Sequence, residues 1–80
     1  MARHEPKYEP LRRHLEMATH PVTMTFEQIA RLVGGLPPSA YRHREWWANS
    51  RGSHVEAAAW LDLRREVVAV DLQHRVVTFS

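Results

Sequence analysis

The chain contains no cysteine among its 80 residues. Disulfide bonds and thiolate zinc sites are therefore excluded as sources of stability, and a reducing cytoplasm is the expected compartment. A chain of this length is close to the smallest size at which a single hydrophobic core holds a fold together. We therefore predict one domain whose stability comes from its core alone.

The sequence also lacks a long apolar run and a strong charge of either sign. No stretch approaches the roughly 20 apolar residues that cross a membrane, and the first ten residues lack the apolar segment of a signal peptide. The formal net charge is +2, which is a mild basic bias and not in itself a sign of nucleic-acid binding. We expect a cytoplasmic protein, associated with the nucleoid if it binds DNA.

Motifs for catalysis and metal binding are missing as well. There is no glycine-rich phosphate loop, no nucleophile elbow and no pair of carboxylates arranged for acid-base work. The histidines lack the spacing of metal ligands; they are His4, His14, His20, His43, His54 and His74. We therefore predict that the protein is not an enzyme and that it uses no metal or other cofactor.

The chain does have enough apolar material for a small core. Hydrophobic residues make up 44% of it, and three of them are tryptophans, each of which contributes several kcal/mol when buried. Residues 1–7 are polar and are expected to form a flexible arm, in which Arg3, His4 and Lys7 fit a frayed terminus better than a phosphate contact. We place a single domain at residues 8–80.

Two early stretches have the spacing of amphipathic helices. The first begins near Pro10 and places Leu11 and Leu15 on one face. The second has a clear start, because Thr25 and Gln28 form the sequence signature of a capping box. Its apolar residues recur at helical spacing, namely Phe26, Ile29, Ala30 and Val33. Two glycines follow and predict the end of this helix, since glycine reaches positive φ without strain.

The segment after the double proline is the most informative for function. We predict a helix over residues 39–49, joined to the preceding helix by a tight turn as in a helix-turn-helix. A helical wheel with Ala40 facing inward places His43 and Trp47 on the inner side. The side chains that then face outward are Arg42, Glu45, Trp46 and Asn49. For Trp46, core packing is still favoured over an exposed contact because of its large apolar surface.

The last third of the chain changes from helical to strand periodicity. A helix is predicted from about residue 54 to 63, opened by a capping box of Ser53 and Glu56. Two runs rich in β-branched residues, 67–72 and 75–79, then flank a short turn in the pattern of a β-hairpin.

Regular alternation along this hairpin places several apolar residues on one face of each strand. They are Val68, Val70 and Leu72 in the first strand, and Val77 and Phe79 in the second. Two strands alone are marginally stable, and residues 22–24 are the candidate for a third. The predicted fold is an α+β domain: a small helix-turn-helix domain of about four helices with a C-terminal β-hairpin, similar to a winged helix.

These elements support a hypothesis of binding to double-stranded DNA. The helix 39–49 would enter the major groove, while the hairpin turn and the loop after the helix would hold the backbone. The predicted contacts are Ser39, Tyr41, Arg42, Arg44, Asn49, Arg51, His74 and Arg75. For these positions the alternative is an ordinary solvated surface or turn. Because cations are few, we expect weak binding by a monomer at physiological salt and tighter binding by a homodimer or several copies along the duplex.

A regulator or a chromosome-associated protein would act in this way. A different class of function also fits the sequence. In this alternative the domain is a protein-interaction module or adaptor that docks on a nuclease or another partner. Trp46 and the edge of the hairpin would then form the contact.

The chain also resembles a family of small uncharacterised bacterial domains that are common in actinobacteria. The resemblance spans residues 8–79 and is most specific from Leu36 to Asn49. The matching residues are Tyr8, Pro10, Leu11, Thr25, Phe26, Ile29, Leu36, Pro37, Ser39, Ala40, Trp46, Trp47, Asn49, Ala59, Trp60, Val70, Asp71 and Leu72. Ala30 departs from the pattern, since relatives often carry glutamate there. Similar segments occur beside nuclease domains, and the resemblance therefore implies a role near nucleic acid.

Overall fold

The computed structural model of the protein describes residues 6–52 and 55–80. Within these residues there are four α-helices, two short 3-10 helices and three strands. In chain order they are α1 (Glu9–Met17), β1 (Val22–Thr25), α2 (Phe26–Val33), α3 (Pro38–Arg42), η1 (Arg44–Trp47), η2 (Val55–Ala57), α4 (Ala58–Leu61), β2 (Val67–Asp71) and β3 (Val76–Phe79). The predicted α+β class is therefore confirmed.

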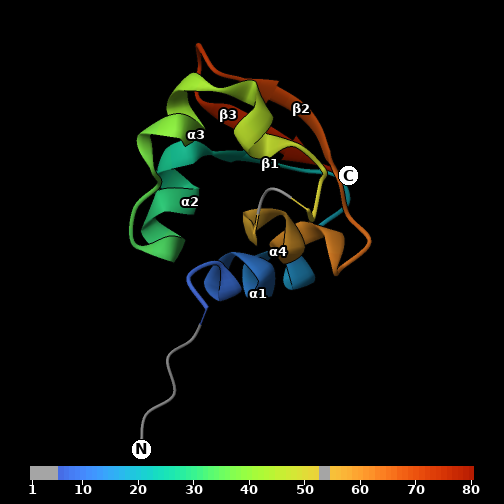
Figure 1. Cartoon of the computed structure of the whole chain (residues 1–80). Helices are drawn as coiled ribbons and strands as arrows, with labels where there is room; N and C mark the ends of the chain where they lie inside the picture. The colour runs from blue at the N-terminus through green and yellow to red at the C-terminus, as the bar shows by residue number, and fades with distance from the viewer. Residues whose placement is uncertain (1–5, 53–54) are drawn as a thin grey trace, which may run out of the picture.

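The strands form one antiparallel sheet in the order β1-β3-β2. The predicted hairpin is confirmed, with β2 and β3 paired around the turn at residues 72–75. The predicted third strand is confirmed too, since Met24 in β1 lies opposite Val77 in the central strand β3. Figure 1 shows α1 and α4 on the side of the sheet away from the hairpin turn, with α2 and α3 close to that turn.

A β-bulge in β2 changes which side chains face the core. The register of β2 against β3 shifts between Val67 and Ala69, so that Val68 is the extra residue. Val68 is 58% exposed, whereas Val67 and Val70 pack against the core. The prediction that Val68 and Val70 share one face of the strand was therefore wrong. In β3, by contrast, Val77 and Phe79 share one face, as predicted, and both are fully buried.

The capping signals around α2 are confirmed. The hydroxyl oxygen of Thr25 accepts a hydrogen bond from the Gln28 amide at 3.0 Å, and the Gln28 side chain accepts one from the Thr25 amide at 2.9 Å. At the other end Gly34 has a φ of 78°, the left-handed conformation that glycine adopts without strain. The predicted face of this helix is buried at Phe26, Ile29 and Val33.

Aromatic side chains from four elements form the centre of the core. Trp47 stacks on Phe26 from α2, with ring centroids 4.8 Å apart, and lies 6.2 Å from Trp60 of α4. Trp60 in turn contacts Phe79 of β3 at 5.3 Å. This stack joins the helices to the sheet, and the predicted core position of Trp47 is confirmed by its exposed fraction of 1%.

The predicted helix over residues 39–49 was wrong. The α-helix α3 ends at Arg42, His43 has extended backbone angles, and a separate 3-10 turn η1 follows. In a continuous helix the carbonyl of Ala40 would accept the amide of Arg44. That carbonyl instead accepts the indole N–H of Trp47 at 2.9 Å. The break therefore allows both adjacent tryptophans to enter the core, which one helix face cannot do.

The break also explains two errors of the helical wheel. His43 was expected on the inner side and is exposed, while Trp46 was placed outward by the wheel and is 8% exposed. The favoured prediction of core packing for Trp46 is confirmed. Its ring meets Tyr8 edge-on with the centroids 6.0 Å apart, so the start of α1 covers it.

Other predictions concern the ends of the described ranges. Arg3, His4, Ser53 and His54 lie outside the described residues. Lys7, predicted in a flexible arm, donates to the carbonyl of Val33 at 3.0 Å. The helix expected over 54–63 is represented by η2 and α4, which end at Leu61. None of the helices formed by the described residues is long and apolar enough to cross a membrane.

Candidate nucleic-acid interface

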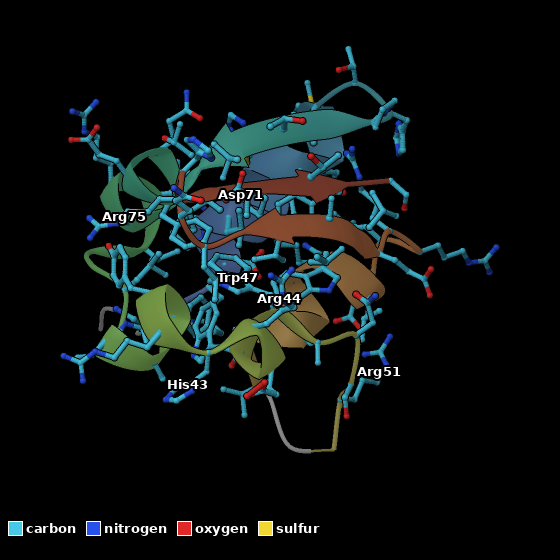
Figure 2. All side chains as sticks on the ribbon, turned by 90° about the horizontal axis from the view of Figure 1, so that it is seen from above. His43, Arg44, Trp47, Arg51, Asp71 and Arg75 are labelled. Carbon is cyan, nitrogen blue, oxygen red and sulfur yellow. The ribbon has the colours of Figure 1, made fainter. Side chains whose placement is uncertain are left out.

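The predicted DNA contacts do not form a single surface. Five of them lie on α3 and the β2–β3 turn, namely Ser39, Tyr41, Arg42, His74 and Arg75. We call these residues the α3–turn edge. The other three, Arg44, Asn49 and Arg51, are exposed but make hydrogen bonds or ion pairs with other elements of the fold. Figure 2 shows Arg75 and Arg51 on opposite sides of the molecule.

Asn49 was predicted to face solvent; it is exposed, but both ends of its amide are bound within the fold. Its Nδ2 donates to the carbonyl of Val67 at 2.9 Å. Its Oδ1 accepts the Val67 amide at 2.8 Å and the Trp60 indole N–H at 2.9 Å. The asparagine thus pairs with the edge of β2 as a neighbouring strand would, and it holds α4 at the same point. Asn49 thus lies at the surface, but its amide is already used by the fold and is not free to pair with a base.

Removing this amide has a clear expected effect on stability. Asn49→Ala leaves the Trp60 indole N–H without its acceptor and frees the edge of β2, so the free energy of unfolding should fall by about 1–3 kcal/mol. Urea denaturation followed by tryptophan fluorescence measures the change. Gln73→Ala removes an exposed amide in the hairpin turn and serves as the control, with no change expected. Equal stability of both variants would contradict this role of Asn49.

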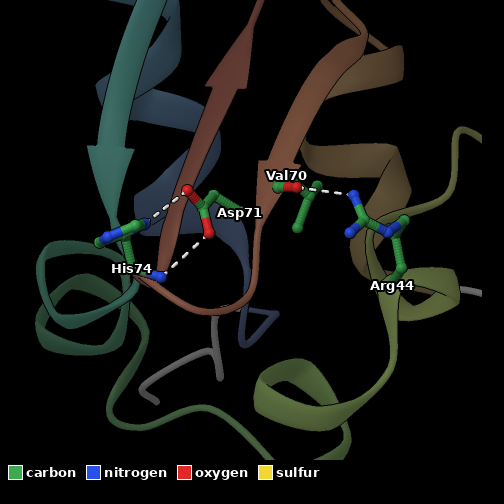
Figure 3. Close-up of polar contacts among 4 residues, drawn as sticks. All are labelled: Arg44, Val70, Asp71 and His74. Carbon is green, nitrogen blue, oxygen red and sulfur yellow. Dashed lines mark hydrogen bonds and ion pairs between the residues drawn. The ribbon is translucent and has the colours of Figure 1, made fainter.

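Arg44 and Arg51 are held by partners away from the α3–turn edge. The Nη1 of Arg44 donates to the carbonyl of Val70 at 2.7 Å, so the side chain crosses from η1 to the outer edge of β2 (Figure 3). Arg51 forms an ion pair with Asp62. Arg44 remains exposed, but its hydrogen bond to Val70 fixes where its guanidinium lies.

Within the α3–turn edge, the arginine of the hairpin turn lies over an aromatic ring of α3. The guanidinium carbon of Arg75 is 5.1 Å from the ring centroid of Tyr41, in the geometry of a cation–π contact. Tyr41 is half-buried and packs edge-on against Phe26 at 5.7 Å. Arg75 itself has a φ of 57°, a left-handed conformation at the end of the turn. The ring and the backbone together therefore fix where this cation lies.

The hairpin turn is closed by an aspartate–histidine pair. Asp71 accepts the His74 amide at 3.0 Å through Oδ1, and its Oδ2 lies 2.7 Å from Nδ1 of the His74 ring (Figure 3). The backbone hydrogen bond from His74, followed by its side-chain bond, lowers the pKa of Asp71 below the ordinary 3.8. Asp71 therefore stays ionised at neutral pH. The stability that ionised Asp71 gives the turn is fully present above that ordinary pKa and is lost as the pH falls through the lowered pKa.

Arg42 provides the second cation of the edge. Its side chain is exposed and makes no hydrogen bond or ion pair with any residue in the described ranges. Ser39, one turn earlier, is half-buried, and its carbonyl accepts the amide of His43 at 2.9 Å. Arg42 is thus available to an anionic ligand without breaking a contact of the fold.

A cleft of about 520 Å³ opens beside Arg75 between the hairpin turn and α2. Its lining residues are Thr25, Phe26, Glu27, Ala30, Tyr41, His74 and Arg75. Glu27 is the acidic member of this set, and it is paired with Arg31 at 3.3 Å. The cleft is therefore lined by two basic residues, Arg75 and His74, and by one acid, Glu27, whose charge is already paired with Arg31.

Sequence reasoning did not identify Asp71 or the contact between Tyr41 and Arg75. A signal for the first was present, because aspartate at the start of a turn commonly accepts amides two or three residues on. The second contact forms only when the hairpin folds back against α3, 34 positions earlier in the chain, so a local sequence pattern cannot predict it. Among the described histidines and carboxylates, no group of three could hold a metal ion.

Together these features define a small α+β domain with a three-stranded antiparallel sheet and one edge that carries two arginines and a histidine. The chain belongs to the family described as Domain of unknown function (DUF7662), whose model matches residues 8–80. No curated protein and no solved structure matches the chain.

Proposed function

We propose that this domain binds the sugar-phosphate backbone of double-stranded DNA through the α3–turn edge. The observation that carries the proposal is the position of Arg75, whose guanidinium lies 5.1 Å from the centre of the Tyr41 ring. Arg42 lies on the same edge, and its side chain has no hydrogen-bond or ion-pair partner among the described residues. Arginine guanidinium groups bind phosphate oxygens with two parallel hydrogen bonds. Two such groups from separate elements can contact two positions along a duplex.

The connectivity supports an arrangement similar to a winged helix. An N-terminal strand pairs with the last strand of a C-terminal hairpin, and two helices joined by a tight turn lie between them in the chain. In this arrangement the β2–β3 turn is the wing, and its His74 and Arg75 face the same ligand as α3. Wings and helix ends of this type contact phosphates and set the register of a protein on the duplex.

The short α3 favours backbone contact over base readout. Its five residues rise only about 7 Å, and it exposes one arginine, so it offers little to the edges of bases in the major groove. Asn49, the side chain suited to adenine, is bound to Val67 and Trp60. We therefore propose binding that depends weakly on DNA sequence, as expected of a chromosome-associated protein or of an accessory domain in a regulator.

The charge of the edge supports modest affinity. Arg42 and Arg75 are opposed by the ionised Asp71, and the net charge of the whole chain is only +2. Each phosphate contact contributes to a salt-dependent affinity, so two or three contacts bind weakly at physiological salt. A homodimer or several copies along the duplex would raise the occupancy.

The alternative of a protein adaptor receives less support. Its two proposed contacts were Trp46 and the hairpin edge. Trp46 is buried against Tyr8 and Trp47, and the outer edge of β2 is occupied by Arg44 and Asn49. Trp46 is therefore not available to a partner, and the hairpin edge is already bound at Val67 and Val70, although Val68 between them is exposed.

The test is a titration of a labelled random duplex, followed by fluorescence anisotropy at several salt concentrations. We expect binding that weakens with salt. Arg42→Ala and Arg75→Asn should each weaken it several-fold and reduce the slope of log Kd against log salt by about 0.9. Asparagine is chosen at position 75 because it tolerates the left-handed backbone there.

Arg13→Ala is the matched control for the loss of one positive charge. Arg13 lies on α1, at the end of the molecule away from the hairpin turn (Figure 1), and its side chain is 60% exposed. We expect this variant to keep nearly all of the affinity. Equal weakening by all three substitutions would show only a nonspecific charge effect, and no binding at low salt would overturn the proposal in favour of a protein partner.

A further inference from the structure

We infer that the cleft beside the hairpin turn seats one DNA phosphate, and that His74 binds this phosphate only as the imidazolium, so that binding takes up one proton. The inference rests on the proposed function and adds a regulation of the same site by pH. It is carried by the hydrogen bonds of His74, the lining of the cleft and the charges that face it.

The pairing with Asp71 decides which ring nitrogen of His74 carries a proton. The Asp71 carboxylate is ionised and can only accept, so Nδ1 of His74, 2.7 Å from Oδ2, must be the donor. In the neutral ring Nε2 is then an acceptor. Figure 3 shows this second nitrogen pointing away from Asp71. A phosphate oxygen also accepts, so the neutral ring offers it no hydrogen bond.

Protonation of the His74 ring allows it to donate a hydrogen bond to the phosphate. In the imidazolium both nitrogens are donors, so Nδ1–H keeps its bond to Asp71 while Nε2–H becomes available to a phosphate oxygen. The proton also adds one positive charge beside Arg75. Binding of phosphate and binding of a proton therefore favour each other, and by linkage the affinity for DNA must rise as pH falls through the histidine range.

The other groups that face His74 do not supply this effect. Asp71 on β2 stays ionised, and Glu27 on α2 is paired with Arg31. Arg75 in the turn and Tyr41 on α3 also line the cleft, and arginine and tyrosine side chains are not groups that change charge where histidine does. The cleft of about 520 Å³ has room for a phosphate between these side chains.

The experiment measures Kd for a labelled random duplex between about pH 7.5 and about pH 5.5 at constant ionic strength, a range in which histidine changes its charge. For the wild type we expect tighter binding at low pH, approaching about tenfold per pH unit for one linked proton. His74→Gln keeps the backbone bond to Asp71 and should lose most of this gain. His43→Gln tests the histidine that directly follows α3, and His14→Gln on α1 is the distant control; both should keep the gain of the wild type within about threefold.

A second readout reports on His74 directly. Dimethyl phosphate is a phosphodiester whose charge is constant over this range, and NMR follows the titration of each histidine ring. We expect the midpoint of the His74 titration to move to higher pH when dimethyl phosphate is added, while that of His14 stays in place. Salt-sensitive DNA binding with the same pH dependence in His74→Gln as in the wild type would overturn this inference and leave the proposed function intact. No binding at any pH or salt would overturn both.

Discussion

Replacing Trp47 with alanine is expected to lower the free energy of unfolding by about 3–5 kcal/mol. The side chain is 1% exposed and lies between Phe26 and Trp60, so its removal opens a cavity at the centre of the aromatic stack. It also leaves the carbonyl of Ala40 without the indole donor that replaces a helical amide. A domain of 80 residues has little stability in reserve, so we expect a largely unfolded protein at 37 °C.

Thermal unfolding followed by circular dichroism measures this effect. Val68→Ala is a suitable control, because Val68 is the exposed residue of the β-bulge and its truncation should change stability by less than about 0.5 kcal/mol. Trp47→Phe keeps the stacking but loses the indole donor, and should fall between the two. A cooperative transition of Trp47→Ala near that of the wild type would show that the stack does not hold the fold together.

Replacing Arg65 with methionine is expected to cost about 3 kcal/mol or more, since each buried carbonyl that loses its donor costs about 1–3 kcal/mol. Arg65 is 1% exposed, and burial lowers the pKa of its guanidinium while leaving it charged at neutral pH. Its donors reach carbonyl oxygens at the end of α1 and beyond: those of Leu15, Ala18, Thr19 and Ser80. One side chain thus satisfies the C-terminal carbonyls of α1 and attaches the residue after β3.

The neighbouring Arg64 is a matched control for this prediction. It is exposed and has a φ of 59°, so Arg64→Asn removes a guanidinium at the surface without straining the backbone. Its expected effect is within about 0.5 kcal/mol. Arg65→Lys keeps the charge but not the planar set of donors and should lose part of the stability. A methionine variant as stable as Arg64→Asn in urea would contradict the role of Arg65.

Elements with local signals were predicted well from the sequence. The capping box at Thr25, the glycine that ends α2 and the β-branched runs of the hairpin each depend on residues a few positions apart, and each is confirmed. The third strand also followed, because the hairpin needed a partner to be stable. These features are decided by propensity and periodicity, which one sequence contains.

The errors lie where a distant partner overrides the local pattern. The helix predicted through residue 49 stops at Arg42 because Trp46 and Trp47 both enter the core, and the freed carbonyl of Ala40 finds the Trp47 indole. The exposed Asn49 has its amide occupied because Val67, 18 residues later, offers it two backbone groups. A helical wheel represents only the residues of one helix, so it takes no account of these partners from other parts of the chain.

The candidate site was predicted in part for the same reason. Arg42 and Arg75 were identified from residue type, and the structure brings their elements to one edge through Tyr41. Arg44 and Arg51 were chosen on the same grounds and are bound elsewhere, to Val70 and Asp62. An arginine that serves the fold and one that is free for a ligand differ only in their neighbours in space.

The most direct test of the proposed interface is an NMR titration of the labelled protein with a random duplex at low salt. If the α3–turn edge binds DNA, the largest shifts should occur at the amides of residues 39–43 and 72–76, with those of α1 nearly unchanged. Shifts centred on α1 and α4, or none at concentrations of DNA well above that of the protein, would contradict this account.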